Sequence, residues 1–340
     1  MGAFSSLGSV TTTEIVQILT TTSALLTANL LRLSITRQVF ARALIQSECL
    51  WTFSKSCCNQ DKDMAALRHF KIGDGRIIPG IGFGTGTALY QQDAANSLVK
   101  AISVGYRHLD TAQMYQNESS VGKGIKASGV DRSQLFITTK VSQNVGQQTE
   151  QTFDRQLADL ELDHVDLYLI HTPILEGTTV EETWKALESI QKKGKAKSIG
   201  VSNFRVSDLK RLEGLTRPAV NQIEFHPYVW KKAQPLYHYC RENNIALQAY
   251  GPLSPLVHFK NGPLDPVLKK IAERHQATEG QVLMAWTIAK GVIPVTTSNK
   301  EERMKELLKE IELSEEEQKE IEQVGSQTHH RKWMDHMDSE

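Results

Sequence analysis

The stretch Val165-Asp-Leu-Tyr-Leu-Ile-His171 decides the fold class of this 340-residue chain. Its residues 167–170 are apolar throughout, with no alternation of polar and apolar side chains. Strands of this kind are typical of parallel sheets whose two faces are both covered by helices. Amphipathic patterns at residues 149–160 and 180–193 predict a helix before and after this strand. The region therefore indicates a fold in which strands alternate with helices.

The alternation continues in both directions along the chain. Short apolar runs predict eight strands, at residues 80–84, 106–110, 135–140, 165–171, 196–202, 219–224, 245–250 and 291–295. Helical patterns follow them, at residues 93–104, 119–127, 149–160, 180–193, 206–212, 233–242, 266–275 with 278–289, and 300–309. Eight such units in roughly 250 residues match the usual size of a (β/α)8 barrel. Because the turn Gly73-Asp-Gly75 also predicts a hairpin at residues 69–78, we expect an α/β TIM barrel with an N-terminal β-hairpin cap.

The glycines around the first strand argue against the main alternative, an open doubly wound sheet with a dinucleotide-binding loop. That loop needs the pattern GxGxxG between a strand and a helix. Gly80, Gly82, Gly84 and Gly86 occupy every second position, so the third glycine of the pattern would fall on a threonine or a leucine. The fingerprint is absent from this strand, and the barrel is favoured.

Composition excludes several classes of function. Lys plus Arg and Asp plus Glu both total 39, so the chain lacks the basic excess with which nucleic-acid-binding proteins neutralise phosphates. The four cysteines, Cys49, Cys57, Cys58 and Cys240, include no CxxC pair, which fits neither a disulfide scaffold nor a zinc site. We expect a cytoplasmic monomer without a metal and with neither nucleic acid nor a membrane as a partner.

Residues 1–65 are predicted to lie outside the barrel domain, which we place at residues 66–334. Residues 15–31 are uncharged but carry too many polar side chains to span a membrane. Residues 1–60 are rich in Ser and Thr and contain four basic residues against two acidic ones, as mitochondrial transit peptides do, but the first 31 residues contain no basic residue. A disordered extension is the preferred interpretation, and a targeting segment with a mitochondrial location is the alternative.

Ionisable side chains end three consecutive predicted strands. Asp110, Lys140 and His171 are the last residues of the second, third and fourth strands, and Tyr115 follows Asp110 by five residues. We expect them to meet, because active sites of such barrels form at the carboxyl ends of the strands. An ammonium group beside a tyrosine stabilises the phenolate and lowers the pKa of the hydroxyl, and a carboxylate keeps the ammonium group charged. With a histidine to polarise a carbonyl oxygen, the set predicts a proton donor for a developing alkoxide.

Polar groups of another kind occur on the later strands. Ser202 and Asn203 end the fifth strand, Gln222 lies in the sixth, and Tyr250 ends the seventh. Amides and a hydroxyl can bracket a carboxamide, and an aromatic face can stack on a flat ring, as a nicotinamide requires. The alternative for any one of them is a buried side chain that satisfies backbone groups.

The chain resembles the aldo-keto reductases over residues 67–334. The matching motifs are Gly82-Phe-Gly-Thr-Gly-Thr87, Leu109-Asp-Thr-Ala-Gln-Met-Tyr115, Ile199-Gly-Val-Ser-Asn-Phe204 and Asn221-Gln-Ile-Glu-Phe-His-Pro227, in this order. The resemblance implies the reduction of an aldehyde or ketone, a small-molecule carbonyl, with NADPH bound without a Rossmann domain. Details such as Tyr250-Gly-Pro-Leu253 and His329-His-Arg-Lys-Trp333 are similar to the fungal branch that reduces α-keto amides and related carbonyls.

The resemblance also implies roles for individual residues. It assigns a catalytic tetrad with Tyr115 as the general acid, together with Asp110, Lys140 and His171. Ser202, Asn203 and Gln222 would hold the nicotinamide carboxamide, and Tyr250 would stack on the nicotinamide ring. Phosphates and adenosine would lie near Ser298, Lys300, Arg303 and Glu306, where an arginine suits a phosphate because its fork donates two hydrogen bonds.

The chain departs from the family at several positions. Thr172 and Gly86 stand where relatives have tryptophan, which predicts a roomier substrate pocket. Val295 follows the Ile-Pro of the eighth strand where many relatives have lysine, so a preference for NADPH over NADH rests on Lys300. The chain after Gly325 is short, which predicts no long gating loop. Two alternatives stay open: a catalytically idle NADPH-binding barrel that acts as a redox-sensing subunit, and an NAD-dependent dehydrogenase.

Overall fold

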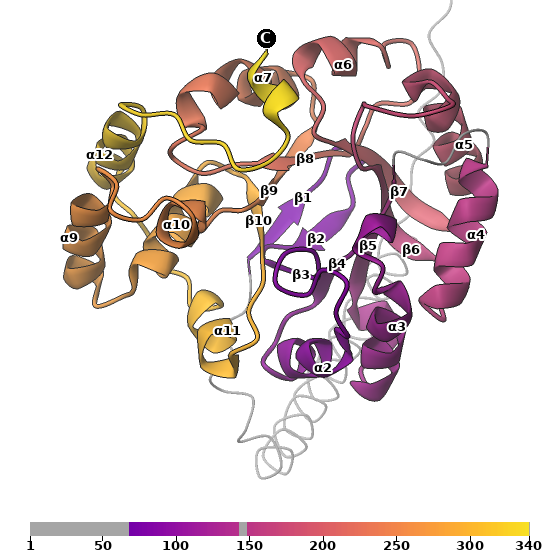
Figure 1. Cartoon of the computed structure of the whole chain (residues 1–340), viewed down its shortest axis with the longest axis horizontal. Helices are drawn as coiled ribbons and strands as arrows, with labels where there is room; N and C mark the ends of the chain where they lie inside the picture. The colour runs from indigo at the N-terminus through magenta and orange to yellow at the C-terminus, as the bar shows by residue number, and fades with distance from the viewer. Residues whose placement is uncertain (1–67, 143–147, 340) are drawn as a thin grey trace, which may run out of the picture. The chain divides into compact units, whose positions relative to one another are not determined.

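The computed structural model describes residues 68–142 and 148–339, and the predicted extension at residues 1–65 lies outside them. Eight parallel strands close into a barrel in the order β10-β3-β4-β5-β6-β7-β8-β9, and the helices surround them (Figure 1). The predicted (β/α)8 fold is therefore confirmed. The strands are β3 (Gly82–Gly84), β4 (His108–Asp110), β5 (Phe136–Val141), β6 (Val165–Ile170), β7 (Ala196–Ser202), β8 (Val220–Glu224), β9 (Ala246–Tyr250) and β10 (Ile293–Thr296).

The helices follow the strands as the amphipathic patterns predict, with additions near the end of the chain. They are α2 (Ala95–Ser103), α3 (Glu118–Ala127), α4 (Thr149–Asp159), α5 (Val180–Lys192), α6 (Val206–Lys210), α7 (Trp230–Glu242), α8 (Ser254–Val257), α9 (Asp265–His275), α10 (Glu279–Ala289), α11 (Glu301–Leu307) and α12 (Glu315–Gly325). Among the described residues, no helix has the length and apolar character that a membrane span requires.

The position of strand β6 in the barrel explains why its side chains are apolar on both faces. Leu167 and Leu169 belong to the apolar cluster inside the barrel. Tyr168 and Ile170 belong to the larger cluster between the barrel and the helices. Each fully buried side chain of this size contributes roughly 1.5–3 kcal/mol through removal of apolar surface from water. The strand is thus stabilised on both sides at once.

A hairpin closes the amino end of the barrel, as predicted. Its strands β1 (His69–Lys71) and β2 (Ile77–Pro79) pair antiparallel. Ile72 and Ile78 are buried and pack with Leu167 and Leu169 inside the barrel. The turn approaches the barrel so closely that a Cβ on Gly73 would lie 2.4 Å from a backbone oxygen. Only glycine fits there, and the hairpin forms an apolar plug.

Helix α12 was not predicted, although its start carries a readable signal. The Ser314 side chain accepts a hydrogen bond from the Glu317 backbone, and the Glu317 side chain accepts one from the Ser314 backbone. This reciprocal capping box is a sequence-level mark of a helix start. The highly charged run Glu315-Glu-Glu-Gln-Lys-Glu320 forms the first half of the helix and obscures its apolar periodicity.

Candidate active site

The structure brings the four candidate catalytic side chains together at the carboxyl ends of the strands. Asp110 ends β4, Lys140 lies one residue before the end of β5, and His171 follows β6, and these strands are neighbours in the barrel. Tyr115 belongs to the 3-10 turn η2 (Gln113–Tyr115), directly after β4. The rings of Tyr115 and His171 lie edge to face with their centroids 5.6 Å apart.

Lys140 and Asp110 form a buried ion pair. The Lys140 Nζ donates to Asp110 Oδ1 at 2.5 Å and to the carbonyl oxygen of Thr111 at 2.9 Å. Burial on its own would lower the pKa of Lys140, but the negative charge of Asp110 and the hydrogen bonds to Asp110 and Tyr115 raise it above the ordinary value. Lys140 therefore stays a cation, with its Nζ 3.4 Å from the Tyr115 hydroxyl oxygen.

The Tyr115 hydroxyl is protonated in this environment. Burial raises its pKa, Lys140 lowers it, and the burial effect is the larger, so that the pKa lies above the ordinary value. The lowering by Lys140 that the sequence predicts is present, but burial outweighs it because the hydroxyl is also removed from water. A protonated hydroxyl beside a fixed cation can still donate its proton, since the cation stabilises the phenolate that forms.

Gly86 lets the tyrosine occupy this position. A Cβ on Gly86 would lie 2.7 Å from Cζ of the Tyr115 ring, which is too close for any other residue without a shift of the ring. The sequence suggested that a missing tryptophan at this position leaves a roomier pocket. The structure adds that the space beside Gly86 is taken by the Tyr115 ring itself.

His171 is neutral at physiological pH. Burial lowers the pKa of its imidazole to about 3, and the nearby Lys140 charge adds to the effect. Its Nδ1 is buried without a hydrogen-bond partner among the described residues. A neutral imidazole can donate one hydrogen bond but cannot supply a second proton, so the geometry suits a group that orients a carbonyl oxygen.

The predicted nicotinamide-binding residues form one hydrogen-bonded cluster. Tyr250 donates from its hydroxyl to Asn203 Oδ1 at 2.8 Å. The Asn203 side chain donates to the His171 carbonyl oxygen at 2.9 Å and to Ser202 Oγ at 3.1 Å. Gln222 donates to Asp110 Oδ2 at 2.7 Å, which connects the cluster to the ion pair. The cluster presents a hydroxyl, amides and an aromatic ring, and this donor and acceptor set fits a nicotinamide carboxamide.

The loop after β10 carries the predicted phosphate-binding residues. Ser298 Oγ accepts a hydrogen bond from the Lys300 backbone at 3.1 Å, which shapes the turn into α11. Neither Lys300 nor Arg303 has a carboxylate partner in the described part of the chain, whereas Lys305 pairs with Glu301. Glu306 accepts a hydrogen bond from the Thr278 hydroxyl at 2.6 Å. Two cations without partners fit the phosphates of NADPH, and Glu306 also has a structural contact.

A second buried carboxyl group, Glu118, lies behind Lys140; the family resemblance extends to Asn117-Glu118, but no role was predicted for Glu118 from the sequence. Glu118 Oε1 accepts hydrogen bonds from Thr139 Oγ1 at 2.6 Å and from Gln156 Nε2 at 2.9 Å. Gln156 also donates to the carbonyl oxygen of Lys140 at 3.1 Å. Burial raises the pKa of Glu118 to about 7. The cluster thus holds the backbone on which Lys140 sits.

The short C-terminal tail reaches the active site, which the sequence did not predict. Glu224, at the end of β8, is buried and accepts hydrogen bonds from the backbone of Lys332 and Trp333, both at 2.9 Å. The Trp333 ring lies with its centroid 5.8 Å from that of Tyr250. His336 contacts the Asn203 carbonyl oxygen at 3.0 Å. The residues after α12 therefore border the predicted nicotinamide site.

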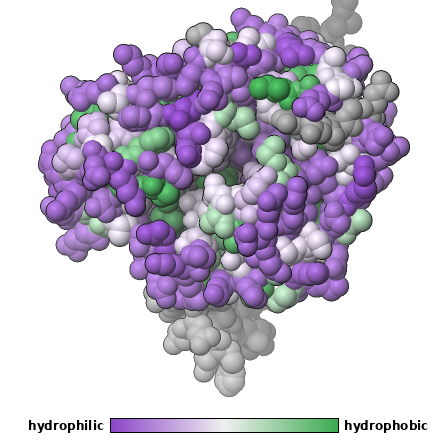
Figure 2. Space-filling view, viewed as in Figure 1, coloured by the Kyte–Doolittle hydropathy of each residue, from purple (hydrophilic) through white to green (hydrophobic). Residues whose placement is uncertain are grey.

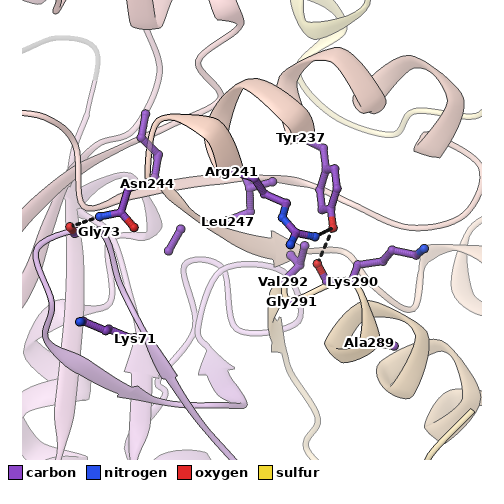
Figure 3. A pocket seen from close by; sticks show the side chains of 12 residues that line it. Lys71, Gly73, Tyr237, Arg241, Asn244, Leu247, Ala289, Lys290, Gly291 and Val292 are labelled. Atoms are coloured by element: carbon purple, nitrogen blue, oxygen red, sulfur yellow. Dashed lines mark hydrogen bonds between the residues drawn. The ribbon is translucent and has the colours of Figure 1, made fainter.

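The view into the barrel shows a hydrophilic surface that is hollowed near its centre, with apolar residues beside the hollow (Figure 2). A separate hollow of about 340 Å³ lies at the opposite, amino end of the barrel (Figure 3). There, Arg241 donates to the Tyr237 hydroxyl at 2.7 Å, and that hydroxyl donates to the Lys290 carbonyl oxygen at 2.8 Å. These contacts fasten the end of α7 to the loop before β10, a structural role.

The chain is similar to known proteins of one family. The model of the aldo/keto reductase family matches residues 77–326. The chain is 40% identical over 278 residues to the NAD/NADP-dependent indole-3-acetaldehyde reductase of Schizosaccharomyces pombe, covering 78% of this chain and 98% of that protein. It is 35% identical over 283 residues to the NADPH-dependent alpha-keto amide reductase of Saccharomyces cerevisiae, covering 76% of this chain and 91% of that protein.

A solved structure is also similar to this chain. The aldo-keto reductase of Bombyx mori in complex with NADP superposes with a TM-score of 0.70 at 33% identity, covering 76% of this chain and 93% of that one. The chain therefore belongs to the aldo/keto reductase family, and it is an NADPH-dependent oxidoreductase of carbonyl compounds.

Proposed function

We propose that Tyr115 is the proton donor in the reduction of an aldehyde or ketone to an alcohol. NADPH, when bound, supplies a hydride to the carbonyl carbon. Tyr115 gives its hydroxyl proton to the carbonyl oxygen, so that the substrate gains one hydride and one proton. The observation that carries this proposal is the fixed Lys140 cation 3.4 Å from the Tyr115 hydroxyl oxygen. It stabilises the phenolate at the moment when the proton leaves.

Asp110 and His171 support this step in different ways. Asp110 holds Lys140 in place and compensates its charge through the contact of 2.5 Å. His171 is neutral, since its pKa is lowered to about 3, and we assign it the task of orienting the carbonyl oxygen by a hydrogen bond. The alternative of an idle NADPH-binding sensor has no observation in its favour, because the four side chains are within reach of one another.

We also propose the cofactor contacts. Ser202, Asn203 and Gln222 hold the nicotinamide carboxamide, and Tyr250 stacks on its ring. The phosphates and adenosine lie near Ser298, Lys300, Arg303 and Glu306, and Lys300 and Arg303 bind the 2′-phosphate that distinguishes NADPH from NADH. Support comes from the hydrogen-bonded cluster around Asn203 and from the absence of carboxylate partners for Lys300 and Arg303 among residues 68–142 and 148–339.

The substrate that we propose is an uncharged aldehyde, ketone or α-keto amide. The S. pombe and S. cerevisiae relatives act, by their names, on indole-3-acetaldehyde and α-keto amides. Aromatic side chains stand beside both sites: the Tyr90 ring lies 6.3 Å from the ring of the catalytic Tyr115, and the Trp333 ring lies 5.8 Å from the ring of Tyr250 in the cofactor site. Such rings favour apolar groups on the carbonyl.

The test is NADPH oxidation followed by absorbance. Aldehydes, α-keto amides and α-keto acids of matched size are compared, with NADH run in parallel. We expect turnover with NADPH and higher kcat/KM for the uncharged compounds. Preference for the α-keto acids would contradict the substrate class. Tight NADPH binding without turnover on any compound would contradict the reductase itself.

The domain limits, oligomeric state and location are proposals as well. We propose that residues 66–334 form the catalytic domain, with packing that continues to the contact between Ser339 and Arg205 at 2.9 Å. Residues 1–65 are an extension, and the protein is a cytoplasmic monomer. A chain without residues 1–65 should remain soluble and active and sediment as a monomer. Import of a residue 1–65 fusion into mitochondria would support the targeting alternative instead.

A further inference from the structure

A buried glutamine that the proposed mechanism does not use lies next to Gln222. Gln248 is on β9, and its side chain is inaccessible to solvent. Its Oε1 accepts a hydrogen bond from Gln222 Nε2 at 2.8 Å. Its own Nε2 has no partner among the described residues. A buried polar side chain with this single contact needs an explanation, since unsatisfied buried donors are rare.

With this contact, both N–H donors of the Gln222 side chain are occupied. A side-chain amide has two N–H donors. One of those of Gln222 goes to Asp110 Oδ2 at 2.7 Å, and the other goes to Gln248 Oε1 at 2.8 Å. Both hydrogens on Nε2 are therefore used inside the barrel. The only group that Gln222 has left for a ligand is its oxygen, which accepts hydrogen bonds.

The two acceptors also prevent the amide from turning over. If Gln222 were reversed, its oxygen would face the Asp110 carboxylate and the Gln248 oxygen, and acceptors would oppose acceptors. Asp110 cannot move away, because its other oxygen is held by Lys140. The orientation of Gln222 is thus determined from two sides, by a charge and by the Gln248 oxygen.

We propose that Gln248 is a positioning residue of the cofactor site, which keeps the Gln222 oxygen directed at the nicotinamide so that the site recognises the N–H2 group of the carboxamide. The inference rests on the cofactor contact proposed for Gln222. It extends the hydrogen-bonded chain from Tyr115 through Lys140, Asp110 and Gln222 to a residue on the far side of the barrel.

The test compares the affinity of three oxidised cofactors by isothermal titration calorimetry, without turnover. NADP+ and its thionicotinamide analogue keep the N–H2 group, whereas the 3-acetylpyridine analogue has a methyl group in its place. The wild-type chain should bind the acetylpyridine analogue about tenfold more weakly than NADP+, the effect of one hydrogen bond. The thionicotinamide analogue should bind within about threefold of NADP+, which excludes a general response to altered rings.

In the variant Gln248→Met, the ratio of the Kd for the acetylpyridine analogue to the Kd for NADP+ should fall from about tenfold to about twofold or less. One N–H of Gln222 is then free, and the amide can pivot on Asp110 and donate to the acetyl oxygen. Gln248→Leu carries the same expectation if the first variant does not fold. Gln248→Glu keeps an acceptor oxygen and should restore the ratio. Leu247→Met, on the same strand, serves as the matched control and should keep the wild-type ratio.

Two results separate the possible failures. If the wild-type chain binds NADP+ but does not discriminate against the acetylpyridine analogue, the role of Gln222 is wrong, and the inference falls with it. If the wild-type chain discriminates and Gln248→Met or Gln248→Leu does so equally, Gln222 keeps its role and the role of Gln248 is overturned.

Discussion

The two ends of the barrel are made from the same strands but hold opposite kinds of residue. At the amino end, Ile72 and Ile78 plug the barrel and pack on its apolar interior. At the carboxyl end, Lys140 and Asp110 are equally buried but charged. Apolar burial stabilises a fold, whereas a buried ion pair contributes little net stability. Removing one partner of such a pair is strongly destabilising, because an uncompensated charge stays buried. The comparison teaches that the amino end stabilises the fold, whereas the carboxyl end holds buried charges that add little stability and serve the proposed reaction.

Lys140→Met should have the largest effect. It removes the cation beside Tyr115, so kcat should fall by about 10³-fold. It also leaves the Asp110 carboxylate buried without its cationic partner, at a cost of about 3–5 kcal/mol in the free energy of unfolding. Steady-state kinetics and urea denaturation measure the two effects. Lys126→Met, which removes an exposed ion pair with Glu161, should change neither. Activity within about tenfold of wild type would remove Lys140 from the proposed mechanism.

Ile78→Ala makes the matching change at the amino end. The buried cavity that it leaves should lower the free energy of unfolding by about 2–5 kcal/mol, with kcat unchanged below the unfolding temperature. Ile77 is 57% exposed, and Ile77→Ala should cost no more than about 0.5 kcal/mol. A loss of kcat comparable to that of Lys140→Met would show that the two ends are not functionally separate.

Glu118 should make the stability of the carboxyl end depend on pH. Its pKa is raised to about 7 in the folded protein, so the folded state holds the proton more tightly than the unfolded chain. The stabilisation of the folded state by protonated Glu118 is complete below the ordinary carboxyl pKa and is lost as the pH rises through about 7. Linkage gives a magnitude of about 3 kcal/mol.

Glu118→Gln should therefore reduce the loss of stability between about pH 5 and about pH 8. Urea denaturation at both values measures it. Glu312→Gln, at a side chain that is 93% exposed, should leave the dependence as in wild type. An unchanged dependence in Glu118→Gln would assign the effect to another group.

The double substitution Lys300→Ala, Arg303→Ala should have the smallest effect and a selective one. The KM for NADPH should rise about 10- to 100-fold through the loss of charge-assisted hydrogen bonds to phosphate. The KM for NADH should stay within about twofold, since NADH lacks the 2′-phosphate. Lys71→Ala, at the amino-end hollow, is the control and should alter neither constant. Equal changes for both cofactors would end the assignment of these residues to the 2′-phosphate.

Much of the fold could be predicted because its signals are local. The apolar run of β6 and the amphipathic patterns beside it follow from a few neighbouring residues. The meeting of Asp110, Lys140 and His171 was also predictable, because parallel strands bring their carboxyl ends to one edge. Once eight strands were counted, the position of each side chain at its strand end predicted the place of the site.

What could not be predicted depends on contacts between distant parts of the chain. The hydrogen bond from the Lys332 backbone to Glu224 joins residues that lie 108 positions apart in the sequence. The orientation of Gln222 results from Asp110 and Gln248 on two other strands. The pKa of Tyr115 is the balance of burial and the Lys140 charge, and the sequence reveals the charge but not the extent of burial.

The central claim, that Tyr115 donates the proton, is tested most directly by Tyr115→Phe. The ring remains, and only the hydroxyl is lost. We predict that kcat falls by at least about 100-fold, while the Kd for NADPH, measured by fluorescence titration, stays within about twofold. Tyr239→Phe, at a half-buried tyrosine on α7 whose hydroxyl donates to Glu213, should match wild type in both. Turnover by Tyr115→Phe at a rate close to that of wild type would contradict the account.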